Sequence, residues 1–314
     1  MDVNESIISI PGIEQYKRDL ASMYSESRKL NVLQEIGDLF YKAAHTRYDF
    51  IIFGPKDAFN KLFIYRGREL EESEANSVKM YSYPPEKYAI CGRFNIEGKP
   101  VFYGSDSVNT AMLESRPKEG CIKYIGIWGV NAVKDVWTTS FVTENLPETN
   151  NWKVFADRFY GAVTDLSNRW PDKKEQILYG YDWINNLFQI EERPYPLTSW
   201  MGNDILYSRN ITLNIEGKIN KGAVDMAVYP SFVTKKHSSN IAISREFADA
   251  YMKLLRVYKV YVHDVKDDEC FYHILQVGDV TGDEVKFRDP TPNEDKNGIV
   301  KPERQVNGTF YLRK

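Results

Sequence analysis

One short stretch of the chain, residues 91–117, brings together three side chains that could do chemistry on a charged ligand. It holds Arg93, Tyr103 and Glu114 within 22 residues, with a Gly-Lys-Pro turn between the first two. An arginine can clamp an anion through its forked N–H donors, a tyrosine can stack on a ring or donate a hydrogen bond, and a carboxylate can stabilise developing positive charge. These are the groups needed to hold a dinucleotide and break a glycosidic bond.

Each of these three side chains also has an ordinary structural explanation. An arginine after a glycine is usually a surface residue, a tyrosine in a strand usually packs in the core, and a glutamate at a helix end is usually solvated. Their order and spacing favour a shared site, because ten positions lead from Arg93 to Tyr103 and 11 more lead to Glu114. The adjacent Cys91 has no histidine nearby in the sequence, which disfavours a nucleophilic role.

Local sequence patterns predict the elements that must position these residues. A short strand is expected at residues 101–103, followed by a short helix that residues 105–107 cap and that runs to about Ser115. If residues 94–96 form a hairpin with that strand, Arg93 lies close to Tyr103. The three side chains would then share one pocket that is open to solvent.

Elsewhere, hydrophobic spacing predicts further helices and strands. Apolar residues at helical spacing predict N-terminal helices across residues 1–50 and a helical insertion after residue 150. An amphipathic helix is expected to start at Ser244 and to present Leu254 and Tyr258 on its apolar face. Strands are expected at residues 50–53, 62–65, 121–130, 223–229 and within 257–287, and loops at residues 69–88 and around Pro290, Pro292 and Pro302.

The block around residues 91–117 also carries a family resemblance. Its segments GRFN, GKPVFYGS and TAMLE, followed far downstream by AVYPS (residues 227–231) and Asn240, resemble the RES domain family. That family's pattern is an arginine in G-R-[WF]-N, a tyrosine in a V-x-Y strand, a glutamate after A-x-x-E, and a late Y-P-S followed by asparagine. An earlier arginine is also typical, and Arg66 in FIYRGRE fits it, with Arg68 as the immediate competitor.

The resemblance covers roughly residues 60–135 and 205–260, and it implies both a fold and an activity. Members of the family resemble ADP-ribosyltransferases in fold, consume NAD as hydrolases, phosphorylases or transferases, and often serve as toxins paired with an antitoxin. The residues that it implies as catalytic are Arg93, Tyr103, Glu114 and Ser231, and those that it implies as binding the NAD are Arg66 and Asn240.

The resemblance therefore implies a toxin-like NAD glycohydrolase or NAD phosphorylase, with NAD as substrate and water or phosphate as acceptor. The residues suit that chemistry, because Glu114 can stabilise an oxocarbenium-like ribose while Arg93 and Arg66 bind the pyrophosphate. Two alternatives stay open: an ADP-ribosyltransferase that modifies a protein target, and a non-catalytic toxin–antitoxin interaction module. The four histidines show no paired ligand spacing, so no metal is expected.

Composition and missing motifs exclude several other functional classes of protein. The 314 residues are 42% hydrophobic and 27% charged, as in ordinary globular proteins, and the net charge of −3 argues against a broad nucleic-acid surface. There is no GxGxxG fingerprint, no P-loop, no CxxC pair, no apolar leader and no membrane-length apolar run. We therefore expect a cytoplasmic protein whose partners are NAD, a candidate cognate antitoxin and a candidate second copy, but neither nucleic acid nor membrane.

These elements predict an α+β fold, and the resemblance implies an ADP-ribosyltransferase-like β core. Residues 1–58 are expected to form an N-terminal helical extension and residues 59–262 the catalytic domain, with the helical insertion at about 150–195. Residues 263–314 are expected to form a β-rich extension packed on the same domain. The insertion carries Trp152, Trp170 and Trp183. It is too apolar to stand free in water, so we expect it to pack on the N-terminal helices and to wall one side of the cleft.

Overall fold

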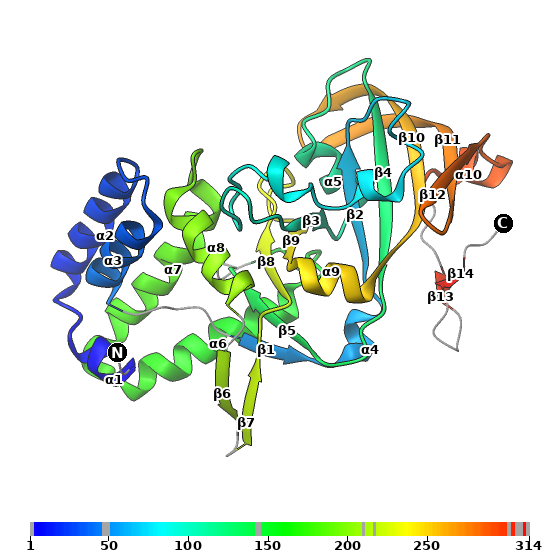
Figure 1. Cartoon of the computed structure of the whole chain (residues 1–314). Helices are drawn as coiled ribbons and strands as arrows, with labels where there is room; N and C mark the ends of the chain where they lie inside the picture. Colours follow the sequence, from blue (N-terminus) through cyan, green and yellow to red (C-terminus); the bar gives the residue numbers. More distant parts are fainter. Residues whose placement is uncertain are drawn as a thin grey trace.

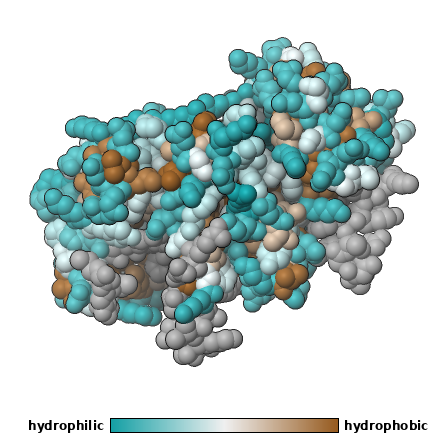
Figure 2. Space-filling view, in the orientation of Figure 1, coloured by the Kyte–Doolittle hydropathy of each residue, from teal (hydrophilic) through white to brown (hydrophobic). Residues whose placement is uncertain are grey.

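The structure is a computed structural model, and it describes residues 3–45, 51–141, 146–208, 211–215, 218–299, 303–304 and 310–311. Within these residues the chain has an α+β fold. Helices gather at one end of the molecule, and long strands form the other (Figure 1). Much of the surface visible in Figure 2 is hydrophilic, with a hydrophobic patch over the N-terminal helices. No helix among the described residues is both long and apolar enough to cross a membrane.

One sheet of ten strands runs through the molecule in the order β1-β5-β8-β9-β3-β2-β4-β10-β11-β12. Its pairs are antiparallel except that β5 and β8 run parallel. The strands are β1 (Ile51–Gly54), β2 (Phe63–Arg68), β3 (Phe102–Ser105), β4 (Ile122–Val130), β5 (Val136–Ser140), β8 (Met226–Pro230), β9 (Ser239–Ile243), β10 (Met252–Lys266), β11 (Glu269–Thr281) and β12 (Glu284–Arg288). Two small antiparallel pairs lie outside it, β6 (Ile211–Ile215) with β7 (Lys218–Gly222), and β13 (Glu303–Arg304) with β14 (Phe310–Tyr311).

The N-terminal helices and the helices of the insertion share one apolar core. They are α1 (Val3–Ile8), α2 (Ile13–Ser27), α3 (Leu33–Ala44), α6 (Lys153–Arg169), α7 (Lys174–Ile190) and α8 (Pro196–Tyr207). Their buried faces meet at residues such as Tyr16, Phe40, Tyr181 and Met201, each at most 1% exposed. The insertion thus packs on the N-terminal helices, and this core continues onto the sheet through Tyr229.

Short helices connect the strands. They are α4 (Lys56–Phe59), α5 (Val108–Glu114), α9 (Arg245–Tyr251) and α10 (Pro292–Asn297), with the 3₁₀ turns η1 (Val78–Tyr81) and η2 (Glu86–Tyr88). A third 3₁₀ turn, η3 (Pro171–Lys173), lies between α6 and α7. The hydroxyl of Ser107 accepts a hydrogen bond from the backbone N–H of Thr110 and so caps α5. Helix α5 is therefore where the sequence predicts it.

Three expectations from the sequence are wrong, and one of them is the loop expected around Pro292, where residues Pro292–Asn297 form α10. The helix that starts after Ser244 ends at Tyr251, and Leu254 and Tyr258 lie on β10, because this segment pairs with β4 on one side and β11 on the other. The expected hairpin before β3 does not form either. Residues 92–95 make a tight turn of their own, in which Gly92 pairs with Asn95, while β3 pairs with β9 and β2.

The expected domain limits fall inside continuous elements. Residue 58 lies in α4, and residue 262 lies within β10. The strand β1 and the strands β11 and β12 belong to the same sheet as the strands between them. The sheet is therefore not interrupted at either limit.

Candidate active site

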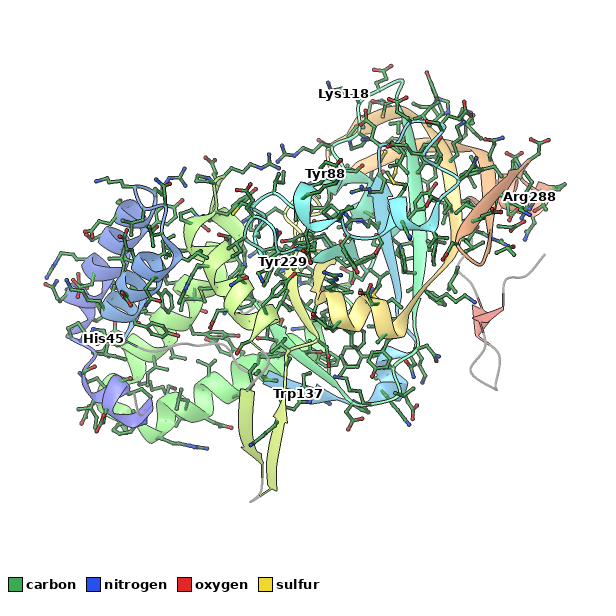
Figure 3. The ribbon with its side chains drawn as sticks, in the orientation of Figure 1. His45, Tyr88, Lys118, Trp137, Tyr229 and Arg288 are labelled. Atoms are coloured by element: carbon green, nitrogen blue, oxygen red, sulfur yellow. The ribbon has the colours of Figure 1, made fainter. Side chains whose placement is uncertain are left out.

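A cavity of about 470 Å³ opens beside β2 and β3. These two strands pair at a single position, Tyr65 with Ser105, whereas β2 pairs with β4 at every residue from Phe63 to Arg68. Beyond that one pair the described residues show no further pairing of β2 with β3, and both strands contribute residues to the lining of the cavity. Figure 3 labels Tyr229, on β8, and Tyr88, at the end of η2, which both line it.

The structure brings the residues singled out from the sequence into one place. The cavity is lined by Arg66, Arg93, Tyr103, Glu114 and Asn240. The sixth residue, Ser231, is fully buried behind this lining and contacts Glu114.

Glu114, the last residue of α5, has one carboxylate oxygen held by two donors. Its Oε1 accepts hydrogen bonds from Oγ of Ser231 at 2.8 Å and from Nδ2 of Asn240 at 2.5 Å. The amide of Asn240 is itself oriented, because its Oδ1 accepts a hydrogen bond from Oγ of Ser105 at 2.7 Å. No described residue bonds Oε2, and the side chain is exposed. A ligand in the cavity can therefore meet a fixed carboxylate with one free oxygen.

Tyr103 acts on the turn that carries Arg93. Its hydroxyl accepts a hydrogen bond from the N–H of Phe94 and donates one to Oδ1 of Asn95, both at 2.8 Å. Burial raises the pKa of Tyr103 well above its ordinary value, so the phenol stays neutral. Because the hydroxyl already has two partners within the turn, it orients the turn and is not a free donor for a ligand.

Arg93 is in turn fixed from the helical side. Its Nη1 donates to the carbonyl oxygen of Phe188, on α7, at 2.7 Å. Its guanidinium carbon lies 5.0 Å from the centre of the Tyr195 ring, which is a cation–π contact. The remaining guanidinium donors have no described hydrogen-bond partner, and Arg93 lines the cavity.

Arg66 is a largely buried cation without a counter-ion among the described residues. Its Nη1 donates to the carbonyl oxygen of Tyr103, its guanidinium lies over the Phe102 ring, and its buried Nε has no described partner. Burial lowers the pKa of Arg66 to about 9. Such a site gains free energy when an anion enters it, because a buried charge is costly until it is paired.

The balance of charge in the cavity is strongly positive. Four arginines line it, Arg66, Arg68, Arg93 and Arg193, against one carboxylate, Glu114, among the described residues. The whole chain carries a net charge of −3. Positive charge is therefore concentrated at this place, which favours an anionic ligand.

Tyr229, Arg193 and Tyr195 are lining residues with functional side chains that were not singled out from the sequence. Tyr229 lies opposite Asn240 in the sheet, and its hydroxyl has no described partner. Its motif could have revealed it, because Tyr229 belongs to the same AVYPS segment as Ser231. Arg193 and Tyr195 come from the insertion, where no motif marks them.

Two other types of chemistry have little support here. Cys91 lines the cavity, but no histidine is among the described residues that line it, so the thiol has no imidazole base there. Within the described residues, no group of three or more potential metal ligands comes together.

Comparison with known proteins agrees with the motif pattern. Residues 68–258 match the family model of the RES domain, which is more than half of the chain, and a search of the curated proteins found no match. The matched region contains Arg93, Tyr103, Glu114, Ser231 and Asn240, and it begins two residues after the earlier arginine. The chain therefore belongs to the RES domain family.

Proposed function

We propose that this protein is an enzyme that consumes NAD by cleaving the bond between nicotinamide and ribose, with water or phosphate as acceptor. The observation that carries the proposal is the pairing of one oriented carboxylate, Glu114, with a cavity otherwise charged by four arginines. NAD presents the complementary groups, a pyrophosphate and a ribose that becomes cationic during cleavage.

In the proposed reaction the N-glycosidic bond breaks with its electron pair going to the pyridinium nitrogen. Nicotinamide then leaves as a neutral molecule, and positive charge develops at C1 of the ribose. The free Oε2 of Glu114 stabilises this charge, or holds the ribose 2-hydroxyl, while Ser231 and Asn240 fix Oε1. An oxygen of water or phosphate then bonds to C1, and water loses a proton in that step.

The arginines account for the binding of the diphosphate. Arg66 lacks a described counter-ion, and Arg93 is held by a backbone carbonyl and an aromatic ring, not by a carboxylate. Neither guanidinium therefore has to give up an ion pair when the substrate enters. Forked N–H donors match phosphate oxygens in geometry as well as in charge.

Transfer of ADP-ribose to a protein target is the second candidate. The rim of the cavity carries Tyr88 and Ile90, which are 63% and 67% exposed. A protein that binds at the rim could bury these apolar groups, whereas water or phosphate would leave them exposed. A cognate antitoxin that neutralises a toxin-like activity is a further proposal, and it rests on the family membership alone.

The deciding experiment is to incubate the purified protein with NAD, with and without phosphate, and to separate the products. Release of nicotinamide and ADP-ribose supports hydrolysis, and a phosphorylated ADP-ribose formed only with phosphate supports phosphorolysis. The Glu114→Gln variant serves as the control. Intact NAD under both conditions would overturn the proposed activity.

A further inference from the structure

The segment 191–195 joins α7 to α8 and carries two side chains of the insertion into the cavity. These are Arg193 and Tyr195. The carboxylate of Glu114 and the arginine Arg66 come from the opposite, sheet-forming part of the chain. The insertion is thus a wall of the cavity as well as a helical layer.

The buried carboxylate of Glu191 anchors this segment to α8. Glu191 is 0% exposed, and it accepts hydrogen bonds from the N–H groups of Leu197 at 3.2 Å and Thr198 at 2.9 Å. The hydroxyl of Thr198 also donates to it at 2.5 Å. Glu191 therefore closes the first turn of α8 and fixes both ends of the loop between the two helices.

A second anchor comes from the N-terminal helices. Arg28, at the end of α2, donates from Nη1 to the carbonyl oxygen of Glu192 at 3.3 Å and from Nη2 to that of Arg193 at 3.2 Å. The backbone of the segment is thus held from two sides. Its side chains on the cavity side need no large rearrangement to meet a ligand.

Tyr195 connects this segment to Arg93, which lies in the turn of residues 92–95. Its backbone is left-handed, with φ 64° and ψ 47°, a conformation that a non-glycine residue keeps only where its surroundings hold it. Its ring lies against the guanidinium of Arg93, which also donates to Phe188 on α7. The insertion therefore sets the orientation of Arg93.

Arg193 is available to a ligand at the mouth of the cavity. Its side chain is exposed, and it makes no hydrogen bond or ion pair with any described residue. Arg66, in contrast, is largely buried near Tyr103. Glu114 and Arg193 line the same cavity, so a dinucleotide that reacts at Glu114 and extends toward the mouth would bring its adenylate half, with the second phosphate, toward Arg193.

We propose that the insertion supplies the second half of the dinucleotide site, in which Arg193 binds the phosphate of the adenylate half of NAD. Tyr195 is a positioning residue that holds Arg93 for the rest of the diphosphate. This inference rests on the proposed function, because it takes NAD as the ligand. It assigns recognition of the distal nucleotide to the insertion and the reaction to Glu114 on α5.

The test compares NAD with nicotinamide mononucleotide, which carries the reacting ribose and one phosphate but lacks the adenylate half. Both are titrated calorimetrically into full-length protein with Glu114→Gln, so that turnover does not disturb the titration. The same titrations are made with Arg193→Ala added, and with Arg169→Ala added as a matched control. Arg169 is an exposed arginine of the same insertion that does not line the cavity.

Arg193→Ala is expected to weaken binding of NAD about tenfold, the usual loss for one charge-assisted hydrogen bond, and binding of the mononucleotide less than twofold. Arg169→Ala is expected to change neither. Equal losses for both ligands, or no loss for NAD, would overturn the assignment of Arg193. The proposed function is tested separately, by whether the wild-type protein releases nicotinamide, so one can fail while the other stands.

Discussion

Asn240 donates its side-chain amide to the carboxylate of Glu114, although 126 positions separate the two residues. Asn240 lies on β9, opposite Ser105 of β3 and Tyr229 of β8, so three adjacent strands contribute to the surroundings of one glutamate. The bond occupies Oε1 and leaves Oε2 free. Glu114 is thereby oriented without being neutralised by a cation, as expected of a group that must face developing positive charge.

Replacing Glu114 by glutamine tests its proposed role. A glutamine can still accept hydrogen bonds from Ser231 and Asn240 through its amide oxygen, so the fold should be kept. The negative charge is lost, and nicotinamide release should fall by about a hundredfold or more. Initial rates give the activity, and thermal unfolding checks the fold. Near-normal release by a well-folded variant would exclude Glu114 as the main stabiliser.

Arg66 leads to a prediction that separates binding from stability. A buried guanidinium without a described counter-ion costs free energy in the ligand-free protein, so Arg66→Met should cause little or no loss of thermal stability. The same change should weaken NAD binding about tenfold or more, because one anion-binding group is gone. Thermal unfolding with and without NAD measures both effects. A melting temperature that falls by many degrees without ligand would show that the arginine is structural.

The parts of the site that the sequence predicts are those marked by local signals. Helix α5 follows from the cap at Ser107 and the β-prone run before it, and both determine where Glu114 lies. The order of Arg93, Tyr103 and Glu114 was enough to suggest a common pocket. Arg193 and Tyr195 were missed because only the packing of α7 and α8 against the sheet brings them to the cavity.

The misassigned segment after Tyr251 has a simple physical reason. Leu254 and Tyr258 stand four positions apart, and residues four apart share a face in a strand as well as in a helix. Local spacing therefore cannot separate the two structures. The segment forms the strand β10 because it pairs with β4, which is distant in sequence, and with β11, which follows it directly in a hairpin. The short buried strand β9 was missed for a related reason, since its first residues, Ser239 and Asn240, are polar.

A cluster far from the cavity predicts how stability depends on pH. Burial alone would raise the pKa of Glu294, but hydrogen bonds from Arg288 and from the backbone and hydroxyl of Thr291 outweigh it and lower the pKa to about 2. A lowered carboxyl pKa contributes stability that is present above the unfolded value, near 4.5, and is lost as the pH falls toward 2. The contribution is roughly 3 kcal/mol, because each tenfold change in the affinity for the proton corresponds to about 1.4 kcal/mol.

Glu294→Gln should therefore lose much of its stability relative to the wild type at pH 6 but little at pH 2.5. Denaturant unfolding across this range measures the difference. Glu284→Gln is the matched control, because Glu284 is exposed on β12 and outside this cluster. If the two variants followed the same pH dependence, the cluster would not be the source of the effect.

Two tyrosines of the cavity should respond differently to loss of the hydroxyl. The Tyr103 hydroxyl is bonded to Phe94 and Asn95, so Tyr103→Phe loosens the turn that carries Arg93. It should cost about 1 kcal/mol of stability as well as NAD affinity. The Tyr229 hydroxyl has no described partner, so Tyr229→Phe should leave the free energy of unfolding unchanged.

A change in KM for NAD in Tyr229→Phe would then reflect a lost contact with the ligand and not a loss of stability. Burial raises the pKa of Tyr229, which keeps the phenol neutral and able to donate. Because this donor lies in the cavity beside Asn240, loss of its hydroxyl should raise KM for NAD about fivefold, the usual effect of one neutral hydrogen bond. Unfolding curves of the two variants measure the loss of stability, and initial rates measure the change in KM for NAD. A stability loss in Tyr229→Phe equal to that in Tyr103→Phe would contradict the division of roles, and so would an unchanged KM.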